Sequence, residues 1–117
     1  CDADATTHYL QYWYRTRGVV TLPQAIRKLT KMPAEVLGLK KRGTLEVGHF
    51  ADINVFDPQT VASGQPTYVN DFPDQTGRLF IKSRGYAATI VNGAIVTEQG
   101  THTGARPGRV IREFARA

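Results

Sequence analysis

The first third of the chain carries large apolar residues at a helical period. In the segment 6–17, three of them recur at the i, i+3, i+4 spacing that places side chains on one helical face: Leu10, Trp13 and Tyr14. Thr6 and Thr7 are of the types that cap helix N-termini, and Gly18 suits the C′ position because glycine adopts positive φ readily. The pattern predicts one amphipathic helix that is capped by these threonines and ends before Gly18.

Two shorter helices are predicted next. The sequence Thr21-Leu22-Pro23-Gln24 combines a hydroxyl N-cap, a proline in the first turn and a glutamine three residues after the cap. A third helix is predicted over residues 32–38, with Pro33 near its start and Gly38 at its end. We expect the apolar residues of this region to be buried: Ile26, Leu29, Val36, Leu37 and Leu39.

After residue 43 the apolar residues recur with a period of two, which is typical of strands. Thr44–Val47 and Ala51–Phe56 both alternate, and Gly48 permits a tight turn between them. Residues 59–77 are rich in Pro, Gly, Asn, Asp and Thr, and we expect them to form an ordered excursion rather than a strand.

A β-hairpin is the clearest local prediction. The β-prone runs 87–91 and 94–98 flank Asn92-Gly93, a dipeptide that favours a type I′ turn because both turn residues need positive φ. Residues 79–81 supply a further short strand. The predicted fold is therefore α+β, with a helical segment, a small antiparallel β-domain and a basic C-terminal tail at residues 1–42, 43–105 and 106–117 respectively.

Composition excludes several classes of protein. A chain of 117 residues with 41% hydrophobic and 21% charged residues is too short for several domains and too apolar for a disordered chain. No apolar run approaches the ~20 residues of a membrane span, no secretory leader opens the chain, and a single cysteine cannot form an internal disulfide. We expect a cytoplasmic location. Residues 1–5 begin with Cys1 and read like the interior of a longer protein, so an excised segment is expected.

The net charge of +5 raises the question of an anionic partner. Much of the excess lies in four arginines near the C-terminus: Arg106, Arg109, Arg112 and Arg116. No aromatic residues alternate with them as a stacking platform would require, so we expect a solvated or intramolecular face and not a nucleic-acid site.

Residues able to support catalysis or bind metal are scattered. The histidines His8, His49 and His102 fall in a helix, a turn and a loop, without His-x-His spacing. The other candidates lack the context that their chemistry needs: terminal Cys1, Ser63 and Ser83 without a nucleophile elbow, Asp2 and Asp4 at an exposed start, and Asp52 and Asp57 at strand and turn positions. We therefore expect no catalytic, cofactor-binding or metal-binding residue in this segment.

An ordered series of motifs nevertheless resembles a known family. The series consists of Leu22-Pro23-Gln24-Ala25-Ile26, Pro33-Ala34, Arg42-Gly43, Ala51-Asp52-Ile53, Val91-Asn92-Gly93 and Thr103–Arg112. It resembles the C-terminal end of the amidohydrolase superfamily, in the branch of the N-acyl-D-amino-acid deacylases. In that family the metal ligands and the catalytic Asp lie upstream of the matched region. Asp2 lacks the Ser and the prompt His that accompany that Asp, and the start of the chain is more similar to a later stretch.

The resemblance implies a parent enzyme that hydrolyses the amide of N-acyl-D-amino acids, with a zinc-bound hydroxide as nucleophile. It implies that residues 1–42 complete the barrel and that residues 43–105 form most of the small β-domain. The expected partner is the rest of the parent chain, namely the barrel and N-terminal β-strands, and the isolated segment is expected to self-associate or to hold its helical third loosely. The alternative is an independent β-rich binding module that uses its sheet edge or Arg-rich tail.

Overall fold

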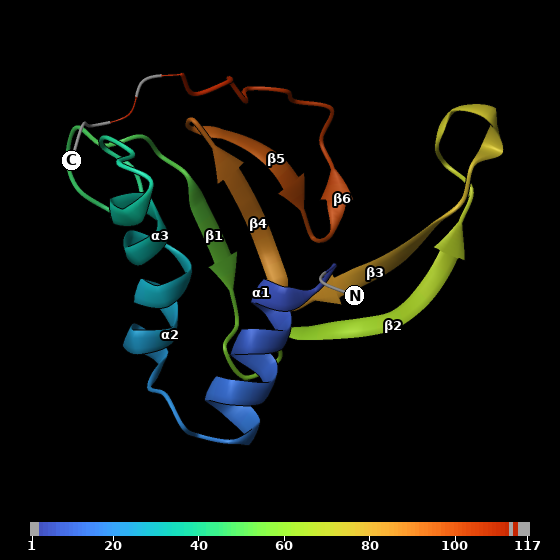
Figure 1. Ribbon diagram of the computed structural model, residues 1–117, viewed down its shortest axis with the longest axis horizontal. Coiled ribbons are helices and arrows are strands. Elements are labelled where there is room, and N and C mark those ends of the chain that lie inside the picture. Colours follow the sequence, from blue (N-terminus) through green and yellow to red (C-terminus); the bar gives the residue numbers. More distant parts are fainter. Residues whose placement is uncertain (1–2, 113, 115–117) are drawn as a thin grey trace.

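The computed structural model describes residues 3–112 and 114, in which helices pack against two antiparallel sheets (Figure 1). The helical elements are α1 (Ala5–His8), the π-helix η1 (Tyr9–Thr16), α2 (Leu22–Leu29), α3 (Lys31–Val36) and the short 3-10 helix η2 (Pro73–Gln75). The strands are β1 (Ile53–Phe56), β2 (Ala62–Val69), β3 (Arg78–Arg84), β4 (Tyr86–Val91), β5 (Ala94–Glu98) and β6 (Thr101–His102). This arrangement confirms the predicted α+β class.

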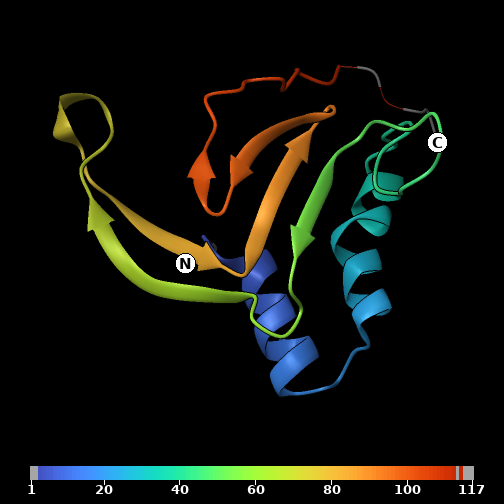
Figure 2. The ribbon, with the colours of Figure 1, turned by 180° about the vertical axis from the view of Figure 1, so that it is seen from behind.

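Four strands form one sheet in the order β1-β4-β5-β6, and β2 and β3 form a separate two-stranded sheet. Seen from behind, α2 and α3 run alongside β1, and the first helix lies at the lower ends of β1 and β4 (Figure 2). No helix in the described part of the chain is long and apolar enough to cross a membrane.

The first helix begins earlier than its sequence suggests. Asp4, not Thr6 or Thr7, occupies the N-cap position, so the predicted capping role of the threonines is wrong. Thr7 is buried, and its Oγ1 lies 3.0 Å from Tyr86 Oη and 3.3 Å from Ser83 Oγ. Its hydroxyl hydrogen-bonds to residues of β3 and β4 and so holds the helix against both strands. Capping preferences consider only adjacent residues and cannot predict such a long-range contact.

The same helix widens into π geometry, which changes the face it buries. The backbone N–H of Arg17 donates to the carbonyl of Tyr12, five residues back. A wider turn rotates Trp13 away from the line through Leu10, so Leu10 is 3% exposed whereas Trp13 is 42% exposed. Trp13 is thus placed wrongly by an α-helical period, while Gly18 ends the helix with φ +61° as predicted.

The second and third helices follow their start and stop residues. Thr21 and Gln24 form a complete capping box, and Gly38 follows α3 with φ +65°. The predicted burial of Val36 and Leu37 is wrong, since their exposures are 80% and 58%. No element in the described residues covers this side of α3, so helical periodicity alone overstated the burial.

Two predictions for the middle of the chain are also wrong. Residues 44–47 form a loop, because no neighbouring strand pairs with them, and Val47 is fully exposed. The region 59–77 contains β2, although it was expected to lack a strand. β2 exists because β3 pairs with it across an irregularity between Ser63 and Pro66, which accommodates the glycine and proline that break the alternating pattern.

The hairpin at Asn92-Gly93 is confirmed. Both residues have positive φ, +48° and +84°, and the turn joins β4 to β5. The buried cluster lies at the meeting point of three regions: Leu10 of η1, Ala25 of α2 and Val61 before β2. The helices and the β-part therefore share one small core.

Candidate functional site

Three sequence motifs meet around Arg42. The guanidinium donates to Asp52 Oδ2 through Nη1 and to Asn92 Oδ1 through Nη2, the latter bond measuring 2.9 Å. Asp52 Oδ1 accepts a 2.8 Å hydrogen bond from the backbone N–H of Asn92. Asp52 lies just before β1 and Asn92 just after β4, so these three residues, here called the Arg42 node, join the paired ends of two strands to the segment that follows α3.

The node also holds the C-terminal segment. Asn92 Nδ2 donates to the carbonyl oxygen of Pro107 at 2.8 Å, and residues 105–112 run across the top of the molecule in Figure 1. The Arg42 guanidinium lies 4.1 Å from the centroid of the Phe50 ring. A groove of about 780 Å³ surrounds these residues, and its cationic lining comes from Lys40, Arg42, Arg109 and Arg112. Residues 107–112 of the basic tail therefore lie against the fold.

The Arg42 node has a structural role and not a catalytic one. The Arg42 side chain is 16% exposed and that of Asp52 is 33% exposed, and the carboxylate is occupied by a cation and a backbone N–H. A guanidinium stays charged and neither accepts nor releases a proton in ordinary chemistry. The motifs reveal these residues one by one, but only the pairing of β1 with β4 brings Asp52 beside Asn92, so the sequence did not predict the node.

The three histidines are separate and each has a local partner. The His8 ring stacks on Tyr12 with a centroid distance of 5.3 Å. His49 Nδ1 lies 2.9 Å from Thr44 Oγ1, and His102 Nδ1 accepts from the backbone N–H of Gly104 at 2.9 Å. Within residues 3–112 and 114, no group of three or more His, Cys, Asp or Glu lies close enough to hold a metal ion.

The two serines that lack a nucleophile elbow, Ser63 and Ser83, lie in a cluster of hydroxyls. Ser63 and Ser83 face each other across β2 and β3, and Ser83 Oγ lies 3.3 Å from Thr7 Oγ1. Ser63 Oγ is buried without a hydrogen-bond partner. Among the described residues, no histidine forms a hydrogen bond with either serine, so none of the three histidines is positioned to take a proton from these hydroxyls.

The remaining carboxylates occupy structural positions. Asp4 is the N-cap residue of α1, but its carboxylate makes no capping hydrogen bond. Cys1, Asp2 and Arg116 lie outside the described residues. Asp57 organises the turn after β1: Oδ1 accepts from the backbone N–H of Gln59 at 2.8 Å and Oδ2 accepts from Thr60 Oγ1 at 2.9 Å. Arg15 of η1 donates to the carbonyls of Pro58 and Val61, which ties the same turn to the helix.

The hydrogen bonds in the Asp57 turn lead to a testable prediction about the pKa of Asp57. The Gln59 N–H, then the Thr60 hydroxyl, hold the pKa of Asp57 below its ordinary value of 3.8. Because this folded-state pKa is depressed, the stabilising contribution of the carboxylate is fully present above its ordinary pKa of 3.8 and is lost as the pH falls through the lower folded-state pKa. In a carboxyl ¹³C NMR titration we expect Asp57 to titrate below 3.8, and Thr60→Ala to raise its pKa. An Asp57 pKa that is unchanged by Thr60→Ala would contradict this assignment.

Comparison with known proteins gives the segment its context. The model of the amidohydrolase family matches residues 3–97. A D-aminoacylase from Alcaligenes xylosoxydans xylosoxydans is 36% identical over 106 residues, which are 91% of this chain and 20% of that protein. The chain thus spans about a fifth of the length of the curated relative that it matches.

Solved structures agree with the sequence comparison. A D-aminoacylase variant in complex with copper chloride superposes with a TM-score of 0.75 at 35% identity, over 92% of this chain and 21% of that one. The N-acyl-D-glutamate deacylase of Bordetella bronchiseptica, complexed with zinc and a phosphonate inhibitor, superposes with a TM-score of 0.73 at 37% identity, over 92% of this chain and 20% of that one. The ordered motifs, the fold that they form and the match over residues 3–97 lead to one conclusion: this chain belongs to the amidohydrolase family.

Proposed function

We propose that this chain is the C-terminal, non-catalytic part of a metal-dependent amidohydrolase whose complete polypeptide hydrolyses the amide bond of N-acyl-D-amino acids. The observation that carries this proposal is the match along almost the whole chain to about one fifth of a D-aminoacylase. The zinc-containing relative, an N-acyl-D-glutamate deacylase, supports the same class of substrate and metal.

Zinc has no suitable site in the described residues of this segment. Its histidines are engaged separately, by Tyr12, Thr44 and Gly104, and three convergent ligands are absent from residues 3–112 and 114. In the proposal, the metal and the proton-transfer group therefore belong to the rest of the polypeptide.

The proposed contribution of this segment is to complete and support the larger enzyme. Residues 1–42 would cover the barrel, residues 43–105 would form most of the small β-domain, and residues 106–117 would form the basic tail. An apolar pocket of about 510 Å³ between the helices and the β1–β4 pair, with Leu10, Leu29 and Phe56 among its lining residues, supports this role. Such an opening is expected where a neighbouring part of a protein has been left out.

The experiment is a paired assay of the longer polypeptide and the 117-residue chain, each supplied with zinc. We expect the longer polypeptide to release the free amino acid from N-acetyl-D-glutamate or a neutral N-acetyl-D-amino acid, at least tenfold faster than from the L-enantiomer. The 117-residue chain is expected to match the protein-free control. Failure of the longer polypeptide on every N-acyl-D-amino acid, or turnover by the short chain, would refute the proposal.

The alternative is an independent binding module. It is favoured by β2 and β3, which pair only with each other among the described strands and so leave a backbone edge available on each side. An open reading frame without barrel sequence before Cys1 would support this alternative.

A further inference from the structure

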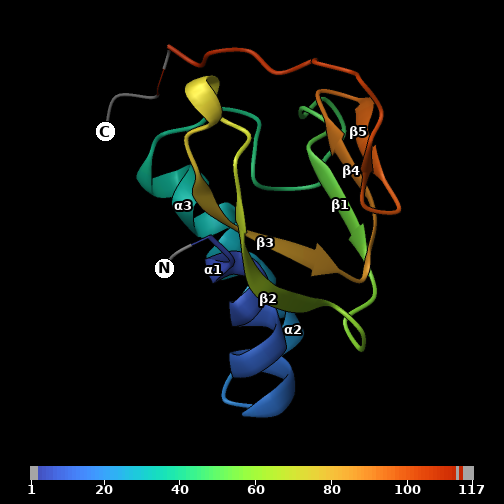
Figure 3. The same cartoon turned by 90° about the vertical axis from the view of Figure 1, so that its right-hand side faces the viewer.

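The β2–β3 hairpin stands apart from the rest of the fold. Figure 1 shows it extending away from the four-stranded sheet, and Figure 3 shows its outer end far from β1, β4 and β5. The described strands include no third partner for it. An isolated two-stranded hairpin is only marginally stable in water, so a hairpin of this length is expected to pack against something.

The strand register places four apolar side chains together on the outer part of one face of the hairpin. Tyr68 is directly opposite Leu79, and Pro66 is directly opposite Ile81, so the four side chains share a face. We call these four residues the docking face. Tyr68 is 70% exposed and Leu79 is 51% exposed, and neither carries a formal charge.

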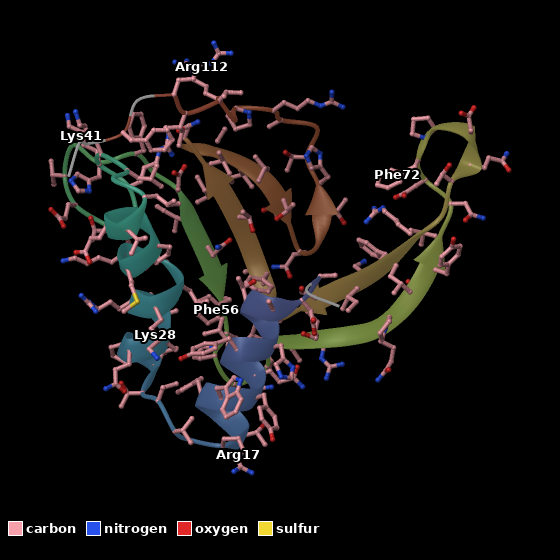
Figure 4. All side chains as sticks on the ribbon, in the orientation of Figure 1. Arg17, Lys28, Lys41, Phe56, Phe72 and Arg112 are labelled. Atoms are coloured by element: carbon pink, nitrogen blue, oxygen red, sulfur yellow. The ribbon has the colours of Figure 1, made fainter. Side chains whose placement is uncertain are left out.

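On the opposite face of the hairpin, the charged and aromatic side chains contact one another. Arg78 donates two hydrogen bonds of 2.7 Å to the carboxylate of Asp71, and its guanidinium lies 5.4 Å from the Phe72 ring centroid and 5.3 Å from that of Phe80. Figure 4 labels Phe72 at the outer end of the hairpin. The charged and aromatic side chains of this face therefore interact with one another, whereas the docking face extends apolar surface into solvent.

The base of the docking face indicates what covers it. Ser83 follows Leu79 and Ile81 at intervals of two residues, which places all three on the same side of β3. Ser83 Oγ lies 3.3 Å from Thr7 Oγ1, so the first helix already packs on this side of the hairpin. Figures 1 and 2 show the start of α1 beside β3. The first helix therefore contacts the hairpin on the side that carries the docking face.

We propose that the docking face binds an apolar surface of the preceding part of the same longer polypeptide. This inference rests on the proposed function, because it requires the four fifths of the matched relatives' length that this chain does not span. The absence of charge from the face and its continuity with the contact made by α1 identify the occupant as a neutral, intramolecular surface.

Thiol accessibility tests the proposal without relying on activity. In a Cys1→Ser background, Leu79→Cys places a thiol on the docking face, and Thr67→Cys places a matched thiol on the opposite face of the same hairpin. Both variants are made in the 117-residue chain and in the longer polypeptide. Maleimide labelling is followed by mass spectrometry of the peptide that carries each introduced thiol.

We expect Leu79→Cys to react at least tenfold more slowly in the longer polypeptide than in the short chain, and Thr67→Cys to react similarly in both. Equal reactivity of Leu79→Cys in the two proteins would overturn the proposal. Protection that is already present in the short chain and grows with protein concentration would assign the face to a second copy and would also overturn it. Tyr68→Cys repeats the test if Leu79→Cys does not fold.

The outcomes separate this inference from the proposed function. An active longer enzyme with an unprotected Leu79→Cys thiol would overturn the docking alone. A protected thiol in a longer polypeptide that hydrolyses no N-acyl-D-amino acid would overturn the proposed reaction and support the docking.

Discussion

Gly85→Ala is expected to lower the free energy of unfolding of the 117-residue chain by roughly 3 kcal/mol or more. Gly85 joins β3 to β4 with φ +85°, where an L side chain costs about 1–2 kcal/mol. A Cβ at this position would lie 2.5 Å from both N and Cα of Val61, which is fully buried. Overpacking of a buried site adds about 1–3 kcal/mol, since backbone atoms cannot rotate away. Urea unfolding monitored by circular dichroism measures the effect.

Gly48→Ala is the matched control for that experiment. Gly48 has the same φ of +85°, but no neighbouring atom lies within 4 Å of the position that its Cβ would occupy. We expect it to cost about 1–2 kcal/mol, the conformational contribution alone. Equal effects of the two substitutions would show that Gly85 does not pack against Val61 as described.

Arg42→Met is expected to lower the free energy of unfolding by roughly 2 kcal/mol. The substitution keeps an unbranched side chain beside Phe50 but removes the donors to Asp52 and Asn92. A hydrogen bond to a charged group contributes about 1.5–3 kcal/mol, and the partly buried Asp52 carboxylate would lose its cation. Urea unfolding again provides the measurement.

Arg27→Met controls for loss of an arginine from a surface ion pair. Arg27 Nη2 lies 3.7 Å from Glu35 Oε2, and both side chains are more than half exposed. We therefore expect the free energy of unfolding to change by at most about 0.5 kcal/mol. A double-mutant cycle of Arg42→Met with Asp52→Asn should give a coupling energy of about 1 kcal/mol or more. Additive effects of the two substitutions would contradict the role assigned to the Arg42 node.

Local sequence rules predicted the elements whose determinants are themselves local. The Thr21–Gln24 capping box and the Asn92-Gly93 turn depend on backbone preferences of a few adjacent residues, and both are present. The failures depend on distant parts of the chain. Thr7 bonds to Ser83 and Tyr86 instead of capping its helix, and β2 exists because β3 pairs with it.

Burial was predicted less well because it depends on what surrounds an element. Val36 has the spacing of a core residue, yet it is 80% exposed in this chain. Several other large apolar residues are similarly exposed, including Leu45, Tyr68 and Leu79. In the proposed function this pattern has a single cause: these residues were selected within a larger polypeptide that supplies further contacts.

The same distinction applies to the candidate site. Sequence spacing separates the three histidines, and in the structure each contacts a different local partner. The Arg42 node required knowledge of the β1–β4 register, which brings the start of one strand beside the end of the other. The spacing of residues along the chain does not predict that strand register.

In the proposed enzyme, the metal chemistry lies outside this segment. Isothermal titration calorimetry with zinc, on the metal-free 117-residue chain and on the metal-free longer polypeptide, tests this claim most directly. We predict stoichiometric binding with a sub-micromolar Kd for the longer polypeptide and no such binding for the short chain. A stoichiometric, sub-micromolar zinc site in the 117-residue chain, lost on substitution of His8, His49 or His102, would contradict the claim.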